Sequence, residues 1–466
     1  DHLEVEKKWH KYWADHETFK TDVWDFSKPK FYALDMFPYP SGVGLHAGHP
    51  EGYTATDIVS RMKRMQGYNV LHPMGYDSFG LPAEQYAVQT GNNPNGFTQK
   101  NIKTFTKQLQ ELGFDYDWSK MIATSDPEFY HWTQWIFKQL YNDGYAKYVD
   151  MPVNWCEELG TVLSNDEVID GKSERGGYPV IRKNMKQLCI DQAAFAERLL
   201  EGLNEIDWPE STKEMQRNWI GRSTGVEVQF EIVGGGKFSI FTTCIETIYG
   251  ITFMVLAPDG DLVQELMPRI KNQDEVKAYI QETVSKSEMD RTELNKGKTG
   301  CRLEGIKAIN PVNGREVEVF IGDFVLANYG TGAVMAVPSH DQRDFEYAIA
   351  HNIDRIQVIE GQDVSEHAFE KQDYLGKGCK LINSEEFTGL TVEEAKVAIT
   401  KKLVDMGIAK ETVNYRFREW IFARQRYWGE PVPIVHLEDG TDYVLPDEEL
   451  PLILPELEDY KGHNGK

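Results

Sequence analysis

The sequence predicts an α/β protein built on a parallel sheet, into which a β-rich segment is inserted. Three observations predict this fold. Residues 31–74 read as a strand, a glycine-rich turn, a helix and a second strand, which is the order of a parallel crossover. Amphipathic helical patterns follow at 97–114 and 129–144. From 219 to about 414 the pattern changes to short alternating strands, and an aromatic, basic segment comes after them.

The bulk composition limits the class of protein. The chain has 50 Lys plus Arg against 74 Asp plus Glu in 466 residues, a formal net charge of −24. This balance excludes a generally basic nucleic-acid coat, but it leaves room for a local basic groove that binds a folded RNA. Five scattered cysteines without a CxxC pair indicate neither a disulfide framework nor a zinc site. No run is long enough for a membrane helix and no secretory segment opens the chain, so we expect a cytosolic protein without membrane contact.

The first predicted helix spans Leu3–Phe19. Trp9 and Trp13 lie one turn apart in it, with Tyr12 beside them. A helix with this spacing carries an aromatic stripe on one face, and we expect the stripe to pack into the core rather than bind a ligand.

The strand and turn that follow are predicted from residue chemistry. Phe31–Met36 alternates and is rich in aromatic and aliphatic residues, which favours a strand. Pro38 and Pro40 prevent its continuation, and the glycines of residues 41–44 allow a tight turn. The next helix should begin near His49, because the proline that follows it is tolerated in the first helical turn.

The same helix is predicted to end at Gly67 and to bury an apolar face. The residues expected on that face are Ile58, Met62 and Met65. Tyr68–Met74 then reads as the second strand. For the helices at 97–114 and 129–144, the residues expected to pack on the sheet are Ile102, Phe105, Leu109 and Leu112 in the former and Trp132, Trp135, Ile136 and Leu140 in the latter.

A nucleotide site is expected where the first crossover helix begins. In such a sheet, ligands bind beyond the carboxyl ends of the strands, and a helix N-terminus there presents free N–H groups to phosphate. His46 and His49 can donate to phosphate oxygens and stabilise charge at the α-phosphate, while Gly48 lets a flat base approach the backbone. Asp77, just past the second strand, suits an α-ammonium group. On residue chemistry alone, the histidines could equally be satisfied surface or capping residues.

The motifs around these histidines resemble a known family. His46-Ala47-Gly48-His49 is similar to the HIGH motif of class I aminoacyl-tRNA synthetases, and the flanking blocks DMFPYPSG and GYDSFGLPAE resemble bacterial-type leucyl-tRNA synthetases. The resemblance implies ATP, with Mg²⁺, and leucine as substrates, tRNA(Leu) as the partner, and a monomer. It also implies that Met36, Phe37 and Tyr39 line a leucine pocket and that Asp77 binds the leucine ammonium.

The resemblance fails at one module. Val153–Asp170 is similar to the start of the family's zinc-bearing insertion, and Cys156 is kept. Residues 171–177 have no cysteine where further ligands would be needed, and one thiolate cannot make a tetrahedral site. We therefore expect no zinc here and a compact metal-free turn instead.

The resemblance and the change of pattern together suggest a division of the chain. An amphipathic helix is predicted over Lys186–Leu203, and strands over Val226–Val233 and Phe238–Thr243. Insertion of a domain is tolerated when its two ends lie close together. The predicted parts are a first Rossmann-like catalytic part at 1–150, a degenerate zinc-module-like insertion at 151–185, a connection at 186–218, a β-rich editing (CP1) domain at 219–414, and a return to the catalytic domain at 415–466.

Two stretches of the β-rich domain can carry chemistry. The hydroxyls of Thr242, Thr243 and Thr247 can bind a sugar, an ester carbonyl or a water, although a strand also favours threonine. Residues 329–344 suggest a pocket wall followed by a helix start, and N-capping with a solvated face is the alternative.

The resemblance implies that these stretches form the family's hydrolytic editing pocket. In it, Thr242, Thr243, Thr247 and Asp344 would be functional, with Thr247 excluding leucine by its bulk and Asp344 holding the substrate ammonium. The wall and remaining pocket residues would be Tyr329, Met335, Val337 and Asp341. This sequence has Cys244-Ile245-Glu246 where the family pattern is Arg-Pro-Asp, so the resemblance does not indicate how the terminal adenosine is held.

The sequence contains no KMSKS signature and no helical anticodon-side domain, so the resemblance spans nearly all of the chain but about half of a synthetase. We therefore expect editing with little synthetic activity. Two other functions stay open: a different HxGH nucleotidyltransferase, such as a small-molecule adenylyltransferase, and a tRNA-binding module that does not adenylate.

Overall fold

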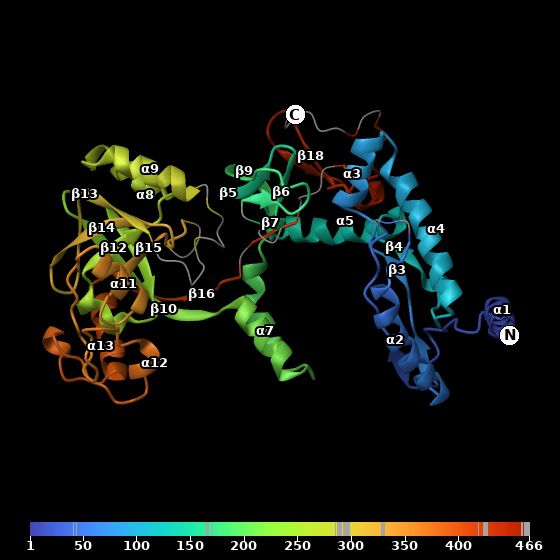
Figure 1. The fold of residues 1–466 in the computed structure, drawn as a ribbon, viewed down its shortest axis with the longest axis horizontal. Coiled ribbons are helices and arrows are strands. Elements are labelled where there is room, and N and C mark those ends of the chain that lie inside the picture. The colour runs from blue at the N-terminus through green and yellow to red at the C-terminus, as the bar shows by residue number, and fades with distance from the viewer. Residues whose placement is uncertain are drawn as a thin grey trace. The chain divides into compact units, whose positions relative to one another are not determined.

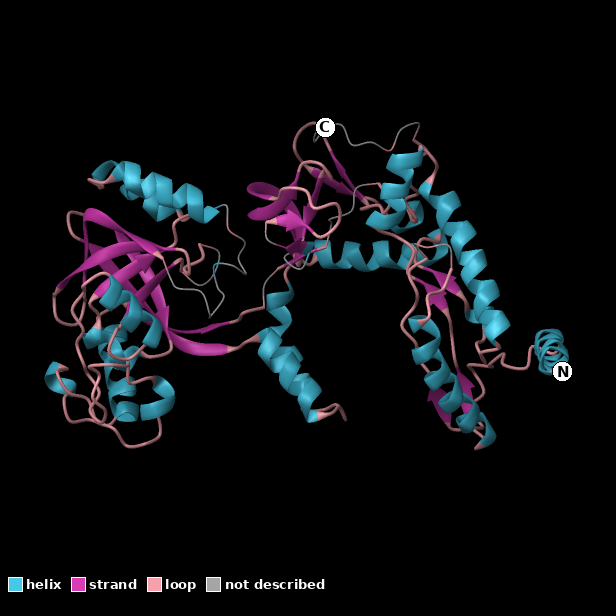
Figure 2. Ribbon diagram, viewed as in Figure 1, coloured by secondary structure: helices cyan, strands magenta, loops and turns pink. Residues whose placement is uncertain are grey.

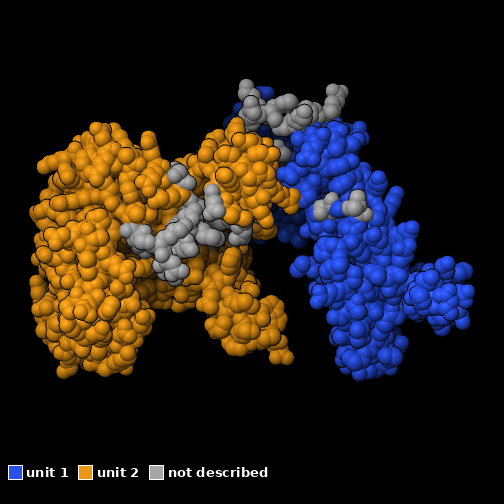
Figure 3. Space-filling model, in the orientation of Figure 1, with its two compact units in different colours: residues 1–148, 188–190, 421–466 blue, residues 149–187, 191–420 orange. Residues whose placement is uncertain are grey.

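The structure is a computed structural model of the chain. It describes residues 1–40, 42, 44–164, 167–169, 171–284, 286, 291, 299–327, 331–417, 419–422, 427–457 and 460. The chain divides into two compact units, which Figure 3 colours separately. Unit 1 comprises residues 1–148, 188–190 and 421–466, and unit 2 comprises residues 149–187 and 191–420.

Unit 1 contains the predicted parallel crossover. Strand β1 (Lys30–Tyr32) pairs in parallel with β2 (Asn69–Leu71), and helix α2 (Gly48–Met65) connects them. A second parallel pair joins β3 (Gly75–Tyr76) and β4 (Ile122–Ala123). The prediction of a parallel α/β unit is confirmed, although the strands are shorter than the sequence suggested. The other helices and strands within unit 1 are α1 (His2–Asp15), α3 (Leu81–Thr90), α4 (Pro94–Leu112), α5 (Pro127–Asn142), β18 (Ile434–His436) and β19 (Asp442–Val444).

The predicted buried face of α2 is wrong. The apolar residues expected there are exposed: Ile58 by 61%, Met62 by 41% and Met65 by 83%. The buried residues of α2 are Tyr53 and Ser60 instead. Ser60 donates its hydroxyl to the buried carboxylate of Asp115 at 2.6 Å. Tyr53 packs in an apolar cluster with Met74 and Leu109, so an apolar contact and a polar contact together determine which side of this helix faces inward.

Helices α4 and α5 differ in how well the sequence predicted them. In α4 the expected residues Ile102, Phe105 and Leu109 are buried, whereas Leu112 is exposed. The helix ends at Gly113, whose φ of 74° suits glycine. In α5 the prediction is wrong for Trp132, Trp135 and Ile136, which are exposed, and is confirmed for Leu140, which packs against an apolar cluster. The side chains that α5 buries are Tyr130, Gln134, Phe137 and Lys138. In α1, Trp9 and Tyr12 are exposed and no residue is buried, so the predicted core stripe is also wrong.

Unit 2 holds most of the strands, which Figure 2 draws in magenta. Its main sheet has the order β11-β10-β13-β14-β12-β15, and β16 also pairs with β10. The two ends of this order, β11 and β15, lie against each other, so the sheet closes on itself. The strands are β10 (Ser223–Ile232), β11 (Lys237–Thr242), β12 (Phe253–Leu256), β13 (Gly300–Ile309), β14 (Glu316–Gly322), β15 (Ala333–Ala336) and β16 (Ala409–Asn414).

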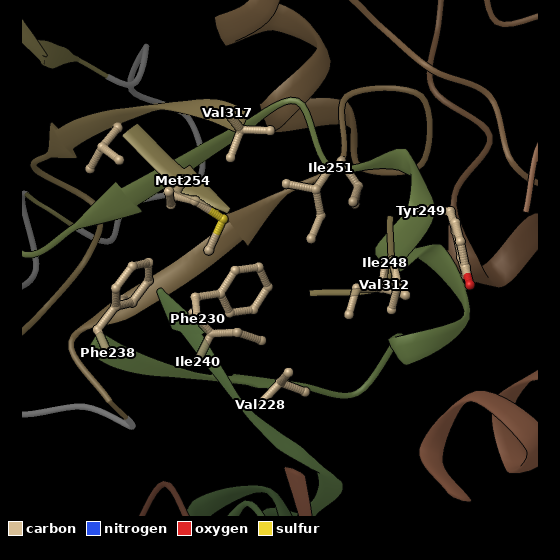
Figure 4. Packing of buried hydrophobic residues seen from close by; sticks show 14 of the residues in the cluster. Val228, Phe230, Phe238, Ile240, Ile248, Tyr249, Ile251, Met254, Val312 and Val317 are labelled. Carbon is tan, nitrogen blue, oxygen red and sulfur yellow. The ribbon is translucent and has the colours of Figure 1, made fainter. Parts of the chain in front are cut away.

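The closed sheet surrounds a large apolar core, and Figure 4 shows part of it. Phe230 and Ile240, from the paired strands β10 and β11, are fully buried in it. The first and last strands of the segment pair with each other, since Ser223 lies opposite Asn414. The two ends of the inserted β-rich segment are therefore adjacent.

Helices cover this sheet, as Figure 1 shows for α9, α11 and α13. The helices of unit 2 are α6 (Ala196–Gly202), α7 (Glu210–Ile220), α8 (Asp261–Leu266), α9 (Gln273–Val284), α11 (Gln342–Ala350), α12 (Lys371–Tyr374) and α13 (Val392–Asp405). A 3-10 helix, Ile245–Gly250, joins β11 to β12. Three strands contain a boundary between the units: β5 (Ala146–Cys156), β9 (Ile181–Ile190) and β17 (Trp420–Ile421).

The predicted helix over Lys186–Leu203 is wrong in its first part, because residues up to Ile190 belong to strand β9. Asp191 then accepts a hydrogen bond from the backbone N–H of Ala194, and helical structure begins only after this cap.

The segment that resembles a zinc module forms short hairpins. Strand β5 pairs antiparallel with β6 (Thr161–Leu163), and β7 (Val168–Ile169) pairs with β8 (Lys172–Ser173). Among the described residues, no group of three or more His, Cys, Asp and Glu side chains is arranged to hold a metal ion. Nor does any helix of the described chain have the length and apolarity needed to cross a membrane.

Candidate functional site

The two histidines lie together where α2 begins. Their rings stack, with 3.8 Å between the centroids. The Nδ1 of His49 accepts the backbone N–H of His46 at 3.2 Å, and the Nδ1 of His46 accepts that of Gly48 at 3.1 Å. Burial, assisted by the neighbouring His46, lowers the pKa of His49 and favours its neutral form. Since Nδ1 is an acceptor in both rings, a neutral ring carries its proton on Nε2, from which it can donate to a phosphate oxygen.

Helix α4 fastens the glycine turn that leads to these histidines. The Oε1 of Gln108 accepts the backbone N–H of Leu45 at 2.8 Å, and the Nδ2 of Asn101 donates to the carbonyl oxygen of Pro40 at 2.8 Å. At Gly44, a Cβ would lie only 2.6 Å from Nε2 of Gln108. A larger residue at this position would therefore have to displace the side-chain amide of Gln108, which holds the N–H of Leu45.

The segment expected to bind leucine lies beside Asp77. The backbone N–H of Asp77 donates to the carbonyl oxygen of Pro38 at 3.3 Å. The hydroxyl of Tyr53 donates to the carbonyl oxygen of Met36 at 3.1 Å. The Met36 and Asp77 residues are both exposed. Phe37 packs so closely on the backbone that a Cβ at Gly75 would lie 2.3 Å from its ring. The segment of Phe37 and Pro38 thus lies beside β3 and Asp77, while the side chain of Met36 is 89% exposed and Tyr39 is half-buried in the same segment.

A buried ionic cluster that the sequence did not predict lies in the same unit. His72 donates from Nδ1 to Asp115 at 2.6 Å and from Nε2 to Asp35 at 2.9 Å. Burial works to lower the pKa of His72, but the hydrogen bonds and charges of the two carboxylates outweigh it and raise that pKa. The pKa values of both carboxyls are lowered, against their own burial, by hydrogen bonds from His72 and its neighbours. The cluster therefore holds a charged imidazolium between two carboxylates.

This cluster connects the elements that carry the site. Asp35 directly precedes Met36, and it also accepts hydrogen bonds from the hydroxyls of Thr56, on α2, and Tyr116. A sequence signal existed, because Asp35 and His72 are polar residues inside segments that otherwise read as apolar strands. Such residues are rarely buried without a partner.

In unit 2, the threonine-rich stretch folds into a tight turn. The backbone N–H of Cys244 donates to the hydroxyl oxygen of Thr242 at 3.0 Å. Thr247 is buried, and its hydroxyl donates to the carbonyl oxygen of Cys244 at 2.7 Å. Because the hydroxyl of Thr247 already donates its hydrogen to Cys244, the methyl group is the part of the side chain most able to contact a substrate.

Strand register brings the second stretch to the same end of the sheet. Phe253, which follows the 3-10 helix, pairs with Ala336 of β15. Met335 and Val337 both pack with the apolar core of unit 2. The expected wall residue Tyr329 lies outside the described residues.

Both aspartates of this stretch accept hydrogen bonds from the backbone. Asp341 caps α11 by accepting the N–H groups of Arg343 at 2.9 Å and Asp344 at 3.1 Å. Asp344 accepts the N–H of Val337 at 2.9 Å. The capping alternative is therefore confirmed for Asp341, while Asp344 connects the start of α11 to the end of β15.

His340, between these residues, is a structural histidine. Its Nδ1 donates to the carbonyl oxygen of Phe369 at 3.1 Å, and its Nε2 accepts the N–H of Val358 at 3.0 Å. Burial lowers the pKa of His340 to about 4, so the ring is neutral and binds two loops together.

Two lysines near the threonine turn were missed by the sequence analysis. Lys371 of α12 and Lys396 of α13 both approach Thr243. Each is more than a hundred residues away from Thr243 in the sequence, and nothing in a local pattern could have indicated the contact.

Comparisons with known proteins agree with this geometry. The family model of class I tRNA synthetases (I, L, M and V) matches residues 8–246, and the model of the leucyl-tRNA synthetase editing domain matches residues 217–404. A similar solved structure is the ternary complex of the Agrobacterium radiobacter K84 agnB2 LeuRS with tRNA and LeuAMS, at 34% sequence identity and a TM-score of 0.80. The match covers 98% of this chain and 53% of that one, so the chain spans about half the length of that protein.

Proposed function

Because this chain belongs to the class I leucyl-tRNA synthetases, we propose that its two units serve two opposed reactions on leucyl-tRNA. Unit 1 binds ATP and leucine for formation of leucyl-adenylate and transfer to tRNA(Leu). Unit 2 hydrolyses tRNA(Leu) that carries a wrong amino acid. The match to an editing domain argues against a small-molecule adenylyltransferase, which does not need such a domain.

The activation reaction uses charge stabilisation and positioning. His46 and His49 donate to the α-phosphate of ATP as negative charge develops there, and Gly48 leaves room for the base. Asp77 binds the leucine ammonium, and Met36, Phe37 and Tyr39 form the wall of the side-chain pocket. Mg²⁺ enters with the phosphates of ATP as part of that substrate.

The editing reaction compensates for the limited ability of a single binding pocket to distinguish similar amino acids. In aminoacyl-tRNA synthetases, small apolar side chains differ by only about 1–3 kcal/mol in a pocket, so a second site must remove errors. The hydroxyls of Thr242 and Thr243 orient the ester and a water, and Asp344 holds the ammonium of the wrong amino acid. Thr247 acts as the sieve that excludes leucine. Tyr329, Met335, Val337 and Asp341 complete the pocket.

The observation that carries the editing proposal is the register of β12 against β15. It supports a single pocket made from the two stretches that the sequence singled out, although they lie about ninety residues apart. Monomeric state and a cytosolic location stay predictions.

The test compares two reactions of the same polypeptide. We expect hydrolysis of isoleucyl-tRNA(Leu), sparing of leucyl-tRNA(Leu), and little leucine-dependent exchange of pyrophosphate into ATP. Equal survival of both aminoacyl-tRNAs would refute the editing proposal, while rapid exchange would refute the expectation of weak synthesis. Stabilisation of unit 1 by ATP or by a leucyl-adenylate analogue distinguishes a substrate-binding unit from a tRNA-binding module, because a ligand of the native state raises the melting temperature.

A further inference from the structure

Two lysine side chains from different helices meet at the turn that follows β11. Lys396 of α13 donates from Nζ to the carbonyl oxygen of Thr243 at 2.9 Å. Lys371 of α12 donates from Nζ to the hydroxyl of the same threonine at 3.4 Å. Both lysines are half-buried. Two positive charges therefore gather at a single residue of the threonine turn, in a chain whose formal net charge is −24.

A buried carboxylate lies within electrostatic reach of both lysines. Glu246 is fully buried, and its Oε1 accepts the hydroxyl of Tyr374 at 3.1 Å. Its Oε2 has no hydrogen-bond partner among the described residues. Burial raises the pKa of Glu246, and the charges of Lys396 and Lys371 act against that rise.

The simplest alternative is that the lysines only neutralise Glu246. Two features argue against it. First, neither ammonium group forms an ion pair with a carboxylate of the described residues. Both donate hydrogen bonds to Thr243. In addition, one carboxylate can offset only one cation, and burial favours its uncharged form. At least one positive charge at this turn is left over, and an anion is the ligand that it suits.

The proposed editing reaction brings an anion to this place. Building on that proposed function, we infer that Lys371 and Lys396 bind a phosphodiester of the single-stranded 3′ end of the tRNA while its aminoacyl ester lies at Thr243. An ammonium group binds phosphate as a point charge and needs no fixed plane, so two lysines from separate helices can share one phosphate. The family pattern has an arginine at the position of Cys244, and a cysteine does not carry that positive charge. Lys371 on α12 and Lys396 on α13 supply it instead.

Binding of an RNA hairpin with a single-stranded CCA end measures this site without requiring catalysis. We expect Lys371→Gln and Lys396→Gln each to weaken binding about tenfold, the effect of removing one charge-assisted hydrogen bond. The slope of log K against log salt should fall by about 0.7 for each phosphate that is no longer neutralised. The matched control is Lys410→Gln, which removes an exposed lysine of the same unit that pairs with Glu227 at 2.9 Å. It should leave both quantities close to those of the parent protein.

The variant Glu246→Gln distinguishes the two roles of the lysines. If they only neutralise Glu246, then adding Glu246→Gln to Lys371→Gln or Lys396→Gln restores both the melting temperature and RNA binding, and the inference is overturned. If they bind phosphate, the double variants keep the weakened binding and the reduced salt slope.

Deacylation of isoleucyl-tRNA(Leu), measured in parallel, separates this inference from the proposed function. Lysine-dependent RNA binding without deacylation contradicts the editing reaction alone. Deacylation with unchanged affinity and salt slope in both lysine variants overturns the lysine site alone. If neither binding nor deacylation occurs, both are wrong.

Discussion

The two units of this protein are stabilised at their centres by different chemistry. Unit 2 closes a sheet around apolar side chains, among them Phe230 and Ile240. Among the described residues of unit 1 the apolar clusters are small, and an ionic cluster of His72, Asp35 and Asp115 lies buried among its elements. The candidate sites follow the same division. Side chains hold the histidine turn of unit 1 in place, whereas strand register aligns the two stretches of the proposed editing pocket in unit 2. The two units should therefore fail under different perturbations.

The largest effect is expected from Asp115→Ala in unit 1. Asp115 accepts hydrogen bonds from His72, Ser60 and Arg64, and its removal leaves a charged imidazolium buried beside only one carboxylate. Breaking a buried pair in this way costs about 3–5 kcal/mol. Hydrogen exchange resolved by peptide should show reduced protection across unit 1 and leave the strands of unit 2 protected. Asp15→Ala, which removes an exposed pair with Lys11, is the control and should cost less than about 1 kcal/mol. An equal reduction of protection in both units would contradict the division.

The second effect is a difference in pH dependence between the units. In unit 2, burial holds the pKa of His340 at about 4 in the folded state, against 6.5 as the ordinary value. Between pH 6.5 and 4 the unfolded chain binds a proton that the folded chain cannot, so the stability of unit 2 falls as the pH falls, by about 3 kcal/mol. Exchange rates of the β10 and β12 amides across this range measure the fall. The variant His340→Asn should flatten the dependence, whatever its absolute stability; a dependence that stays as steep would mean that other groups cause it.

For the buried His72 of unit 1 the sign of the effect is reversed, whereas His49, whose pKa is lowered, follows the sign of His340. The pKa of His72 is raised in the folded state, so its contribution to stability is complete below pH 6.5 and is lost as the pH rises through the raised value. The pKa values of Asp35 and Asp115 are lowered, so their contributions are present above pH 3.8 and are lost as the pH falls through the lowered values. Mild acid should therefore weaken the contacts of His340 in unit 2 before those of the His72 cluster in unit 1.

This contrast also explains what the sequence could predict. Apolar periodicity located the paired strands of the inserted segment, and turn chemistry located the start of α2 near His49, because both are local effects. Periodicity failed for α2, where Tyr53 and Ser60 rather than Met62 are buried, because their polar and apolar partners lie elsewhere in the chain.

The candidate sites divide in the same way. Motif positions such as His46 and Asp77 could be read from the sequence, since each motif is contiguous. The contacts of Lys371 and Lys396 with Thr243 could not, since they depend on how distant helices pack on the closed sheet.

The third effect concerns selectivity in unit 2. If the methyl group of Thr247 excludes leucine, Thr247→Ala should make the protein hydrolyse correctly charged leucyl-tRNA(Leu), with a gain of about 10- to 200-fold in rate for a difference of one small apolar group. Thr247→Ser keeps the hydroxyl but removes the methyl group, and it should also admit leucine. Thr247→Val keeps the bulk but cannot donate to the carbonyl oxygen of Cys244, and it should still exclude leucine. ATP binding by unit 1 should be the same in all three variants. Survival of leucyl-tRNA(Leu) with Thr247→Ala would remove Thr247 from the sieve.

The smallest effect is expected in α2, where an exposed apolar residue, Met65, can be compared with a buried polar residue, Ser60. If α2 were buried through its apolar residues, Met65→Ser would cost several kcal/mol, as large-to-small changes in a core do. Because Met65 is 83% exposed, we expect less than about 0.5 kcal/mol in chemical denaturation followed by peptide-resolved exchange. Ser60→Ala, five residues earlier, should cost about 1–3 kcal/mol, since it leaves the buried Asp115 carboxylate with one donor fewer. A larger destabilisation by Met65→Ser than by Ser60→Ala would mean that α2 packs through its apolar face, and that unit 1 is stabilised in the same way as unit 2.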